Sequence, residues 1–457
     1  MNHTPHNHHH QDMRIEHDLL GELEVPKDAL YGIHTQRALL NFPVQGNRTS
    51  GDFSELIEGF ALTKKAVAIT NGLGGFLDAE RVKAIVAAAE WILTERQFHH
   101  FPIHALHGGG GTSLNMNVNE VIANYAEELL GGRRGEYRHI HPNDHVNLHQ
   151  STSDVNLTAY HIAIIRRWSR VEPNFRRLIN TLRVKGKQWY NQKRLARTCL
   201  QDAVEITFED LFSGYAGFVE RSAERITELV DRLHTVNLGG TIVGRKNDVP
   251  EGYFERVIAV LCQVTEDTKY NRFVNLFDAA QNVDDLVAVS SALNIMARGL
   301  IKIAKDLRLL ASGPEAGFAE IRLPTVQAGS SMMPGKVNPV IPEFVIQLCL
   351  FAAGNHTACE SALDHGELDL NIWSSLIIYS ILNQMELLSN AVISFESKCI
   401  KDLEIDAERN TRHADSLFET LSRLMKEHGY STINEIAKLA EGDTDRLEAI
   451  LKEKQLI

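Results

Sequence analysis

One stretch in the second half of the chain restricts the fold more than any other. Apolar residues recur there at alternating intervals of three and four positions: Leu286, Val289, Leu293, Met296, Leu300, Ile303, Leu307 and Leu310. This period is typical of a long helix that packs along its length against other helices. By itself it fits an intramolecular core and a subunit interface equally well. Residues 157–190, 211–235 and 376–400 also read as continuous helices, and strand-like runs are scarce. We therefore predict a mainly α-helical chain with a long central bundle.

The size and charge of the chain narrow the classes of function. At 457 residues the chain is too long to be organised around one ordinary hydrophobic core, so we expect two to three domains. The net charge of −12 disfavours nucleic acid and anionic membranes as partners, because both select a basic surface. No uninterrupted apolar run reaches the ~20 residues of a membrane-spanning helix. The five cysteines are scattered and form no CxxC pair, which indicates reduced thiols and a cytoplasmic location.

The segment Gly329–Glu343, GSSMMPGKVNPVIPE, carries the most chemistry. Its glycines and prolines predict a loop. Two hydroxyls, the Lys336 ammonium and the Asn338 carboxamide are groups that together recognise a carboxylate. Most segments of this composition are solvated surface loops. A phosphate-binding loop is excluded by spacing, because five residues and not four lie between Gly329 and Gly335, and Val337 follows the lysine.

This segment resembles the signature loop of the aspartase/fumarase superfamily, whose shared form is GSSxMPGKxNP. The resemblance implies a mainly helical, three-domain subunit, with residues 1–150, 151–405 and 406–457 as domains and central helices that form a homotetramer core. It also implies elimination across the C2–C3 bond of a succinyl substrate with release of fumarate. Ser330 would be the base that removes the C3 proton, and Ser331, Lys336 and Asn338 would hold the carboxylates.

Other segments extend the resemblance. Tyr31–Thr35, YGIHT, resembles the aspartase form, where fumarases usually carry WGxQT. Gly108–Asn124, GGGGTSLNMNVNEVIAN, places glycines before a helix start, a combination that suits either a hinge or a carboxylate cradle. Its similarity to the family favours the cradle, with Thr112 as a substrate contact. By the same resemblance, Ser151, Thr152 and Thr198 contact the substrate.

Histidines raise the question of a metal site. His141, His145 and His149 stand four residues apart, and histidines at such spacing can chelate zinc on a helix. However, the turn at 142–144 interrupts such a helix, and the related family segment needs no metal for catalysis. We therefore expect no metal and no cofactor. The opening MNHTPHNHHH resembles a terminal tail and is left out of the functional argument.

The match weakens around the leaving group. Ser153 stands where aspartases carry Asn, and Cys199 stands where they carry His or Gln. Arg245 and Lys246 stand where family members usually carry a GTGLN segment. These two cations are either solvated loop charges or partners for an anionic group of the substrate. Nothing beside Cys199 supplies a base, so we interpret it as a pocket-lining residue and not as a nucleophile. Ser153 and Cys199 thus define a candidate leaving-group pocket.

The function expected from the resemblance is conversion of L-aspartate to fumarate and ammonia in a small-dicarboxylate site. Three alternatives remain at this stage. The first is a lyase for an N-substituted or enlarged aspartate, and the second is a fumarase. The third is a catalytically silent structural relative built on the same bundle, against which the joint presence of Ser330, Lys336 and Asn338 argues.

Overall fold

The computed structural model describes residues 12–44, 46, 48–415 and 417–457. The histidine-rich opening therefore lies outside the described residues. The chain clusters into two compact units. We call Met1–Val171, Arg225–Asn294 and Ala352–Glu386 unit 1, and Glu172–Glu224, Ile295–Phe351 and Leu387–Ile457 unit 2. The predicted three-domain division at residues 150 and 405 stays a prediction.

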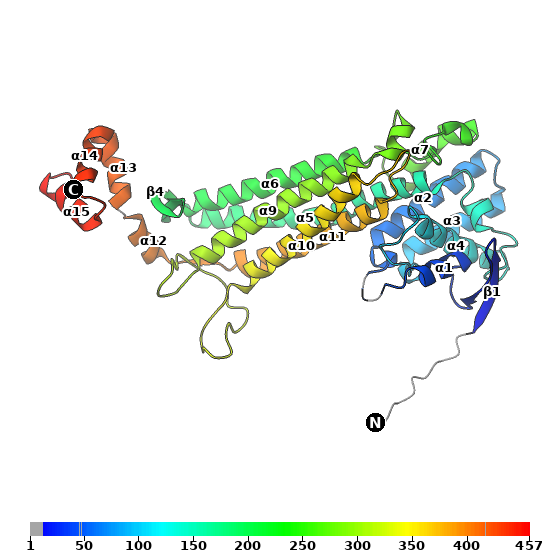
Figure 1. Cartoon of the computed structure of the whole chain (residues 1–457), viewed down its shortest axis with the longest axis horizontal. Helices are drawn as coiled ribbons and strands as arrows, with labels where there is room; N and C mark the ends of the chain where they lie inside the picture. Colours follow the sequence, from blue (N-terminus) through cyan, green and yellow to red (C-terminus); the bar gives the residue numbers. More distant parts are fainter. Residues whose placement is uncertain (1–11, 45, 47, 416) are drawn as a thin grey trace, which may run out of the picture. The chain divides into compact units, whose positions relative to one another are not determined.

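Five long helices dominate the described chain (Figure 1). They are α5 (Thr152–Gln188), α6 (Phe208–Arg232), α9 (Asp284–Leu310), α10 (Val340–Leu363) and α11 (Ser374–Phe395). The predicted helical stretches coincide with α5, α6, α9 and α11, and all eight residues of the apolar repeat are buried. The mainly helical fold is therefore confirmed, and the repeat forms a core because its side chains face neighbouring helices.

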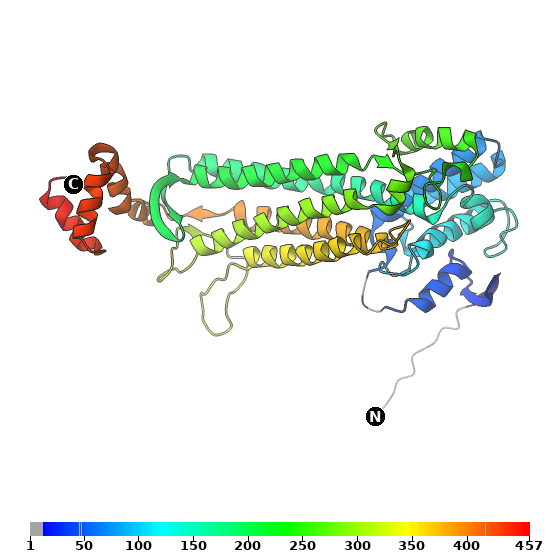
Figure 2. The ribbon, with the colours of Figure 1, turned by 45° about the horizontal axis from the view of Figure 1, so that its top comes forward.

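Within unit 2, the segments of α5, α6 and α9 run side by side (Figure 2). Gly299 of α9 faces Phe218 of α6 so closely that a Cβ at this position would overlap the aromatic ring. Tyr215 of α6 donates a hydrogen bond to Asp306 of α9 at 2.9 Å. A small residue and a polar pair thus fix the spacing of these two helices.

Unit 1 holds the shorter helices of the first part of the chain. These are α1 (Ile33–Asn41), α2 (Ser54–Leu73), α3 (Ala79–Thr94), α4 (Thr112–Leu129), α7 (Glu251–Thr265) and α8 (Leu276–Gln281). The carboxylate of Glu120 on α4 accepts hydrogen bonds from the backbone N–H groups of Gly32, His34 and Thr35, at 2.8–3.1 Å. These are unpaired donors at the start of α1, so the YGIHT segment is held to α4 by its helix end.

Unit 2 ends in four short helices: α12 (Ala407–Ala414), α13 (Leu417–His428), α14 (Tyr430–Leu439) and α15 (Thr444–Glu453). The last three share a small apolar cluster of their own, which includes Leu424, Ile433 and Leu451. Packing against this cluster stabilises three helices that are each too short to be stable alone.

The strands are short and occur in pairs. β1 (Met13–Asp18) pairs antiparallel with β2 (Gly21–Pro26), and β3 (Lys193–Thr198) pairs antiparallel with β4 (Gln201–Thr207). The other strands have two residues each: β5 (Thr235–Val236) pairs parallel with β6 (Asn271–Arg272), and β7 (Ile321–Arg322) antiparallel with β8 (Glu404–Ile405).

Two helical segments, Asp284–Leu310 and Ser374–Ile400, are long and apolar enough to span a membrane by length and composition alone. More than half of each apolar window is buried inside the protein. Core helices of this kind pass the same test, so their apolar character is explained by packing.

Candidate active site

The ten residues predicted for the site are divided between the two units. Unit 1 contains Thr112, Ser151, Thr152 and Ser153. Unit 2 contains Thr198, Cys199, Ser330, Ser331, Lys336 and Asn338. Each group is described by itself.

A turn of three glycines leads into α4. Gly109, Gly110 and Gly111 all have positive φ angles, of 83°, 62° and 83°, a backbone region that side chains strongly disfavour. A Cβ on Gly111 would also overlap the amide of Asn156, which instead donates a hydrogen bond to the Gly111 carbonyl at 3.2 Å. The turn places Thr112, half-buried, as the first residue of α4. This is the geometry expected of an anion-binding helix end.

The start of α5 lies against the same end of α4. Asn115 of α4 donates from Nδ2 to the Oγ1 of Thr152 at 3.4 Å, so the glycine-turn segment and the Ser151–Thr152 pair meet in unit 1. Asp154 fixes this arrangement. Its Oδ1 accepts from the Ser151 N–H at 2.9 Å, and its Oδ2 accepts from the N–H groups of Gly239 and Thr241 at 2.9 and 3.3 Å.

Burial raises the pKa of Asp154 to about 6, against the lowering effect of those three N–H donors. Ser153 is buried too, and its Oγ has no hydrogen-bond partner among the described residues. A buried hydroxyl without a partner is uncommon, so the Ser153 Oγ keeps an unused donor and acceptor.

Lys64 is a buried residue of this region that the sequence analysis missed. It is fully buried on α2, and its Nζ donates to the side-chain oxygens of Asn147 and Gln150 at 3.0 and 2.9 Å. Asn147 also accepts from Asn115 at 3.1 Å. Burial lowers the pKa of Lys64 to about 7, and the charge of Asp154 raises it only in part. The available signal was a lysine set among apolar residues on a helix.

The signature loop Gly329–Asn338 lies in unit 2, in the irregular segment between β7 and α10. The Gly329 N–H donates to the Lys336 carbonyl at 2.9 Å, and the Asn338 side-chain amide donates to the Gly329 carbonyl at 2.8 Å. Gly335 has a φ of 82°, which explains the requirement for glycine in this turn. These contacts close the loop on itself.

Ser330 is the second residue of the closed loop. Its Oγ accepts hydrogen bonds from the N–H groups of Met332 and Met333, at 3.1 and 3.0 Å. N–H donors directed at an oxygen favour its anionic form. Ser331 and Lys336 are exposed, and Lys336 forms no ion pair with any described residue. An ammonium without an ion-pair partner, on the same loop as this hydroxyl, suits a carboxylate ligand.

Thr198 and Cys199 lie at the tip of the β3–β4 hairpin. Thr198 pairs with Gln201, and the two residues between them, Cys199 and Leu200, have φ angles of 53° and 62°. This is the backbone of a tight two-residue hairpin turn. Both Thr198 and Cys199 are exposed, and no hydrogen bond joins them to the signature loop among the described residues.

Cys199 lines a cavity of unit 2 with the apolar side chains of Leu200, Leu309 and Phe318. The hairpin is anchored close to its tip, since Arg197 forms an ion pair with the buried Glu320 at 2.6 Å. Arg197 therefore has a structural partner.

The three histidines considered as metal ligands make separate contacts. His141 accepts from the N–H groups of Asn143 and Asp144 at the start of a π-helix, Pro142–Val146. His145 accepts from the His141 N–H, and His149 contacts the Asn71 carboxamide at 2.8 Å. In the described part of the chain, no three His, Cys, Asp or Glu side chains are placed to hold one metal ion.

Arg245 and Lys246 are exposed in the structure, and Arg245 forms an ion pair with Asp248 at 3.1 Å.

Comparison with known proteins adds to this geometry. Residues 21–354 match the family described as "Lyase". An aspartate ammonia-lyase of Bacillus sp. is 38% identical over 94% of this chain and 91% of its own length. A class II fumarate hydratase of Thermosynechococcus vestitus is also 38% identical, over 96% of this chain and 94% of its own. Among solved structures, the fumarate lyase:delta crystallin of Brucella melitensis bound to cobalt has a TM-score of 0.92 at 39% identity, covering 97% of this chain and 96% of its own.

The fold and these matches show that the chain is an enzyme and belongs to the lyase family. Within that family it is similar to the aspartate ammonia-lyases, which are carbon–nitrogen lyases. The predicted membership of the aspartase/fumarase superfamily is confirmed. The comparisons do not separate aspartase from fumarase, because both kinds of relative reach the same identity.

Proposed function

We propose that this protein eliminates ammonia from L-aspartate to give fumarate, with Ser330 as the base. The main support is the closed signature loop, in which two backbone N–H groups point at the Ser330 Oγ. A serine alkoxide is otherwise inaccessible near neutral pH, and such donors lower that barrier. The aspartase-like YGIHT segment favours aspartate over malate as substrate.

In the proposed reaction, the Ser330 alkoxide takes the proton from C3, and the electron pair passes into the adjacent carboxylate as an aci-carboxylate. That pair then forms the C2–C3 double bond as the C2–N bond breaks, and ammonia leaves with the bonding electrons. Thr112, Ser151, Thr152 and Ser331 supply neutral donors to the developing charge, and Thr198 contacts the substrate. Lys336 and Asn338 hold the second carboxylate and orient the substrate.

We also propose a homotetramer whose sites combine segments from different subunits. Unit 2 leaves large apolar side chains exposed on its long helices: Val184, Ile295, Leu309, Phe344, Leu350 and Ile393. Exposed apolar surface of this extent is typical of subunit interfaces. The five free cysteines support the predicted cytoplasmic location.

A second candidate is a lyase for an N-substituted or enlarged aspartate. Its support is the leaving-group pair, since Ser153 and Cys199 are both smaller than the Asn and the His or Gln of aspartases. The unpartnered Oγ of Ser153 adds a free hydrogen-bonding group there. A fumarase is the third candidate, supported by relatives of equal identity.

The test is the ultraviolet absorbance of fumarate formed by the purified protein from L-aspartate, L-malate and N-substituted aspartates in parallel. We expect L-aspartate to react fastest. A faster reaction with L-malate would establish a fumarase, and a faster reaction with an N-substituted compound would establish the second candidate. Restoring bulk with Ser153→Asn and Cys199→His should then shift preference back toward aspartate. No fumarate from any compound would leave only a structural role.

A further inference from the structure

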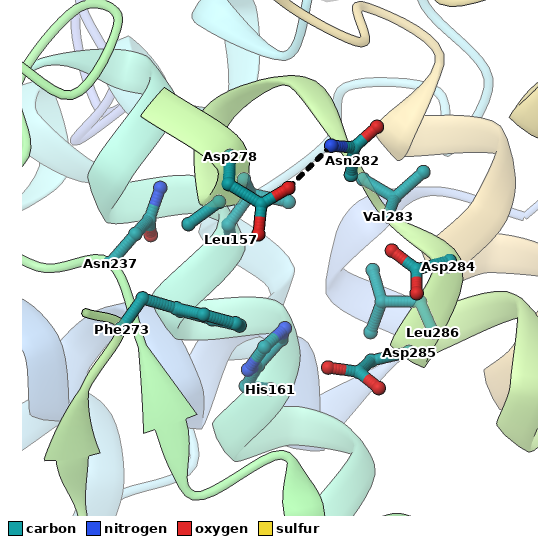
Figure 3. Close-up of a pocket in the computed structure, with 11 residues that line it drawn as sticks. Leu157, His161, Asn237, Phe273, Asp278, Asn282, Val283, Asp284, Asp285 and Leu286 are labelled. Carbon is teal, nitrogen blue, oxygen red and sulfur yellow. Dashed lines mark hydrogen bonds between the residues drawn. The ribbon is translucent and has the colours of Figure 1, made fainter. Parts of the chain in front are cut away.

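A small cavity lies in unit 1, away from the residues assigned above. Its volume is ≈ 30 Å³, and its walls come from α5, the turn at residue 237, α8 and the start of α9 (Figure 3). A space of this size holds one or two particles as large as water. Its polar lining consists of Asn237, Asn282, His161 and the carboxylates of Asp278, Asp284 and Asp285. No lysine or arginine lines it.

Two deeply buried groups offer hydrogen-bond acceptors to this cavity. His161 is 6% exposed, and its Nδ1 contacts the carbonyls of Leu233 and Thr235 at 3.0 and 3.1 Å. Because carbonyls only accept, Nδ1 carries the proton. Burial lowers the pKa of His161 to about 4, so the ring is neutral and Nε2 is an acceptor. Asn237 is 3% exposed, and its Oδ1 has no partner among the described residues.

Carboxylates complete the lining. Figure 3 shows Asp285 with its carboxylate directed toward the ring of His161, and Asn237 on the other side of the pocket. Burial is the largest cause that raises the pKa of Asp285; Asp284 and Asp278 raise it further, while Arg232 lowers it. Asp285 forms no ion pair within 4 Å in the described part of the chain. Asp278 already has one donor, because Asn282 Nδ2 donates to its Oδ1 at 2.6 Å. The site thus combines negative charge with the unpartnered oxygen of Asn237.

We propose that this cavity binds an ammonium ion. An ammonium ion carries one positive charge and four N–H donors, which match the carboxylates, the Asn237 oxygen and the His161 nitrogen. A water molecule has two protons and no charge to pair with the half-buried carboxylate of Asp285. Potassium and sodium lack donors and prefer oxygen ligands to a ring nitrogen. No described set of three His, Cys, Asp or Glu side chains forms a metal site, so a divalent ion fits poorly.

The cavity is connected to the candidate active site through one short segment. Asn237 begins a turn in which the N–H groups of Gly239 and Thr241 hold Asp154, and Asp154 holds the Ser151 N–H. An ion bound to Asn237 therefore stabilises the turn that positions Ser151. The proposal rests on the proposed function in one respect, since ammonium is then the product that the site senses.

The test measures the thermal unfolding of the full-length protein in ammonium, potassium, sodium, magnesium and choline chlorides at equal ionic strength. No aspartate or fumarate is present, so the result is independent of which substrate the enzyme accepts. We expect the unfolding temperature to rise with ammonium in a saturable way, and choline to give no such rise. Asp285→Asn should raise the half-saturating ammonium concentration by about tenfold or more, because it removes a charged acceptor. Glu95→Gln, an exposed change outside the cavity, should leave it unaltered.

Asp278→Asn, at an exposed position, serves as a second variant should Asp285→Asn fold poorly, with the same expected direction. An equal effect of potassium, sodium or magnesium would overturn the assignment to ammonium. The absence of a saturable rise with ammonium would also overturn the proposal. An unchanged half-saturating concentration in both variants would assign the ammonium effect to another site and would overturn it as well.

Discussion

The reactivity proposed for Ser330 depends on backbone N–H groups and not on a neighbouring side-chain base. The two N–H donors from Met332 and Met333 are fixed by the closed loop, so they meet the alkoxide without reorganising. This assigns the serine a role that its exposed neighbour Ser331 does not share, although the two differ by one position.

Ser330→Ala is expected to lower turnover by about 10²–10⁴-fold, because it removes the proton acceptor while leaving the binding groups in place. The initial rate of fumarate formation measures the effect. Ser397→Ala, an exposed serine of unit 2 whose Oγ donates to the Ile393 carbonyl, should retain wild-type turnover. Near-full activity of Ser330→Ala would remove this residue from the mechanism.

Lys64 makes stability depend on pH in a defined window. Its pKa is about 7 in the folded protein and 10.5 for an ordinary lysine, so between these values the unfolded chain binds more protons. Stability from this residue therefore rises with pH from about 7 to 10.5. Lys64→Met should abolish that rise in urea-unfolding midpoints measured across the window.

Lys65→Met is the matched control for this experiment, because the neighbouring Lys65 is less buried and forms an ion pair with Glu90 at 2.9 Å. It should keep the rise. Asp154, with a pKa of about 6, titrates below the window. If Lys64→Met keeps the same rise of the unfolding midpoint with pH as Lys65→Met, Lys64 is charged throughout this window.

At the scale of elements, the sequence predicted helices well and contacts poorly. The 286–310 repeat identified α9 because burial of one face requires that period. The motifs located the glycine turn and the signature loop, because special backbone angles demand glycine there. Lys64 and the cavity at Asn237 escaped prediction, since each depends on residues far apart in the chain that only packing brings together.

The contact between α6 and α9 gives a prediction at this scale. Gly299→Ala should destabilise the protein by about 1–3 kcal/mol, because the new methyl group would overlap the Phe218 ring. Gly214→Ala on α6 has no heavy atom within 4 Å of the added carbon. It should instead be neutral or stabilising, by up to about 1 kcal/mol. Denaturant unfolding measures the free energy of unfolding of both variants. Equal values would show that α6 and α9 move apart to accommodate the added methyl group without cost.

At the scale of the whole molecule, the predicted site residues are divided between the two units, and this division bears on the tetramer that we propose. Thr112 and the Ser151–Thr152 pair belong to one unit, and the signature loop to the other. In the tetramer that we propose, a complete site takes these segments from different chains, so no single chain need carry every intact residue.

Subunit mixing tests this arrangement. Thr112→Val and Ser330→Ala should each be inactive, and mixing them under conditions of subunit exchange should restore part of the activity. Ser330→Ala mixed with Ser331→Ala should restore none, because both changes lie on one loop. Mass measurement of the mixed oligomers verifies exchange. Verified exchange without recovery in the first pair would contradict shared sites.

The hairpin tip at Cys199 has a practical consequence for protein chemistry. Of the five cysteines, three are buried, Cys262 is half-buried and Cys199 is exposed. Burial also raises the pKa of Cys349 and Cys399 to about 12, which suppresses their thiolates. A maleimide dye should therefore attach selectively to one defined, conformationally restricted position. A dye can therefore be attached at Cys199 without introducing a new cysteine, at a residue of the candidate leaving-group pocket.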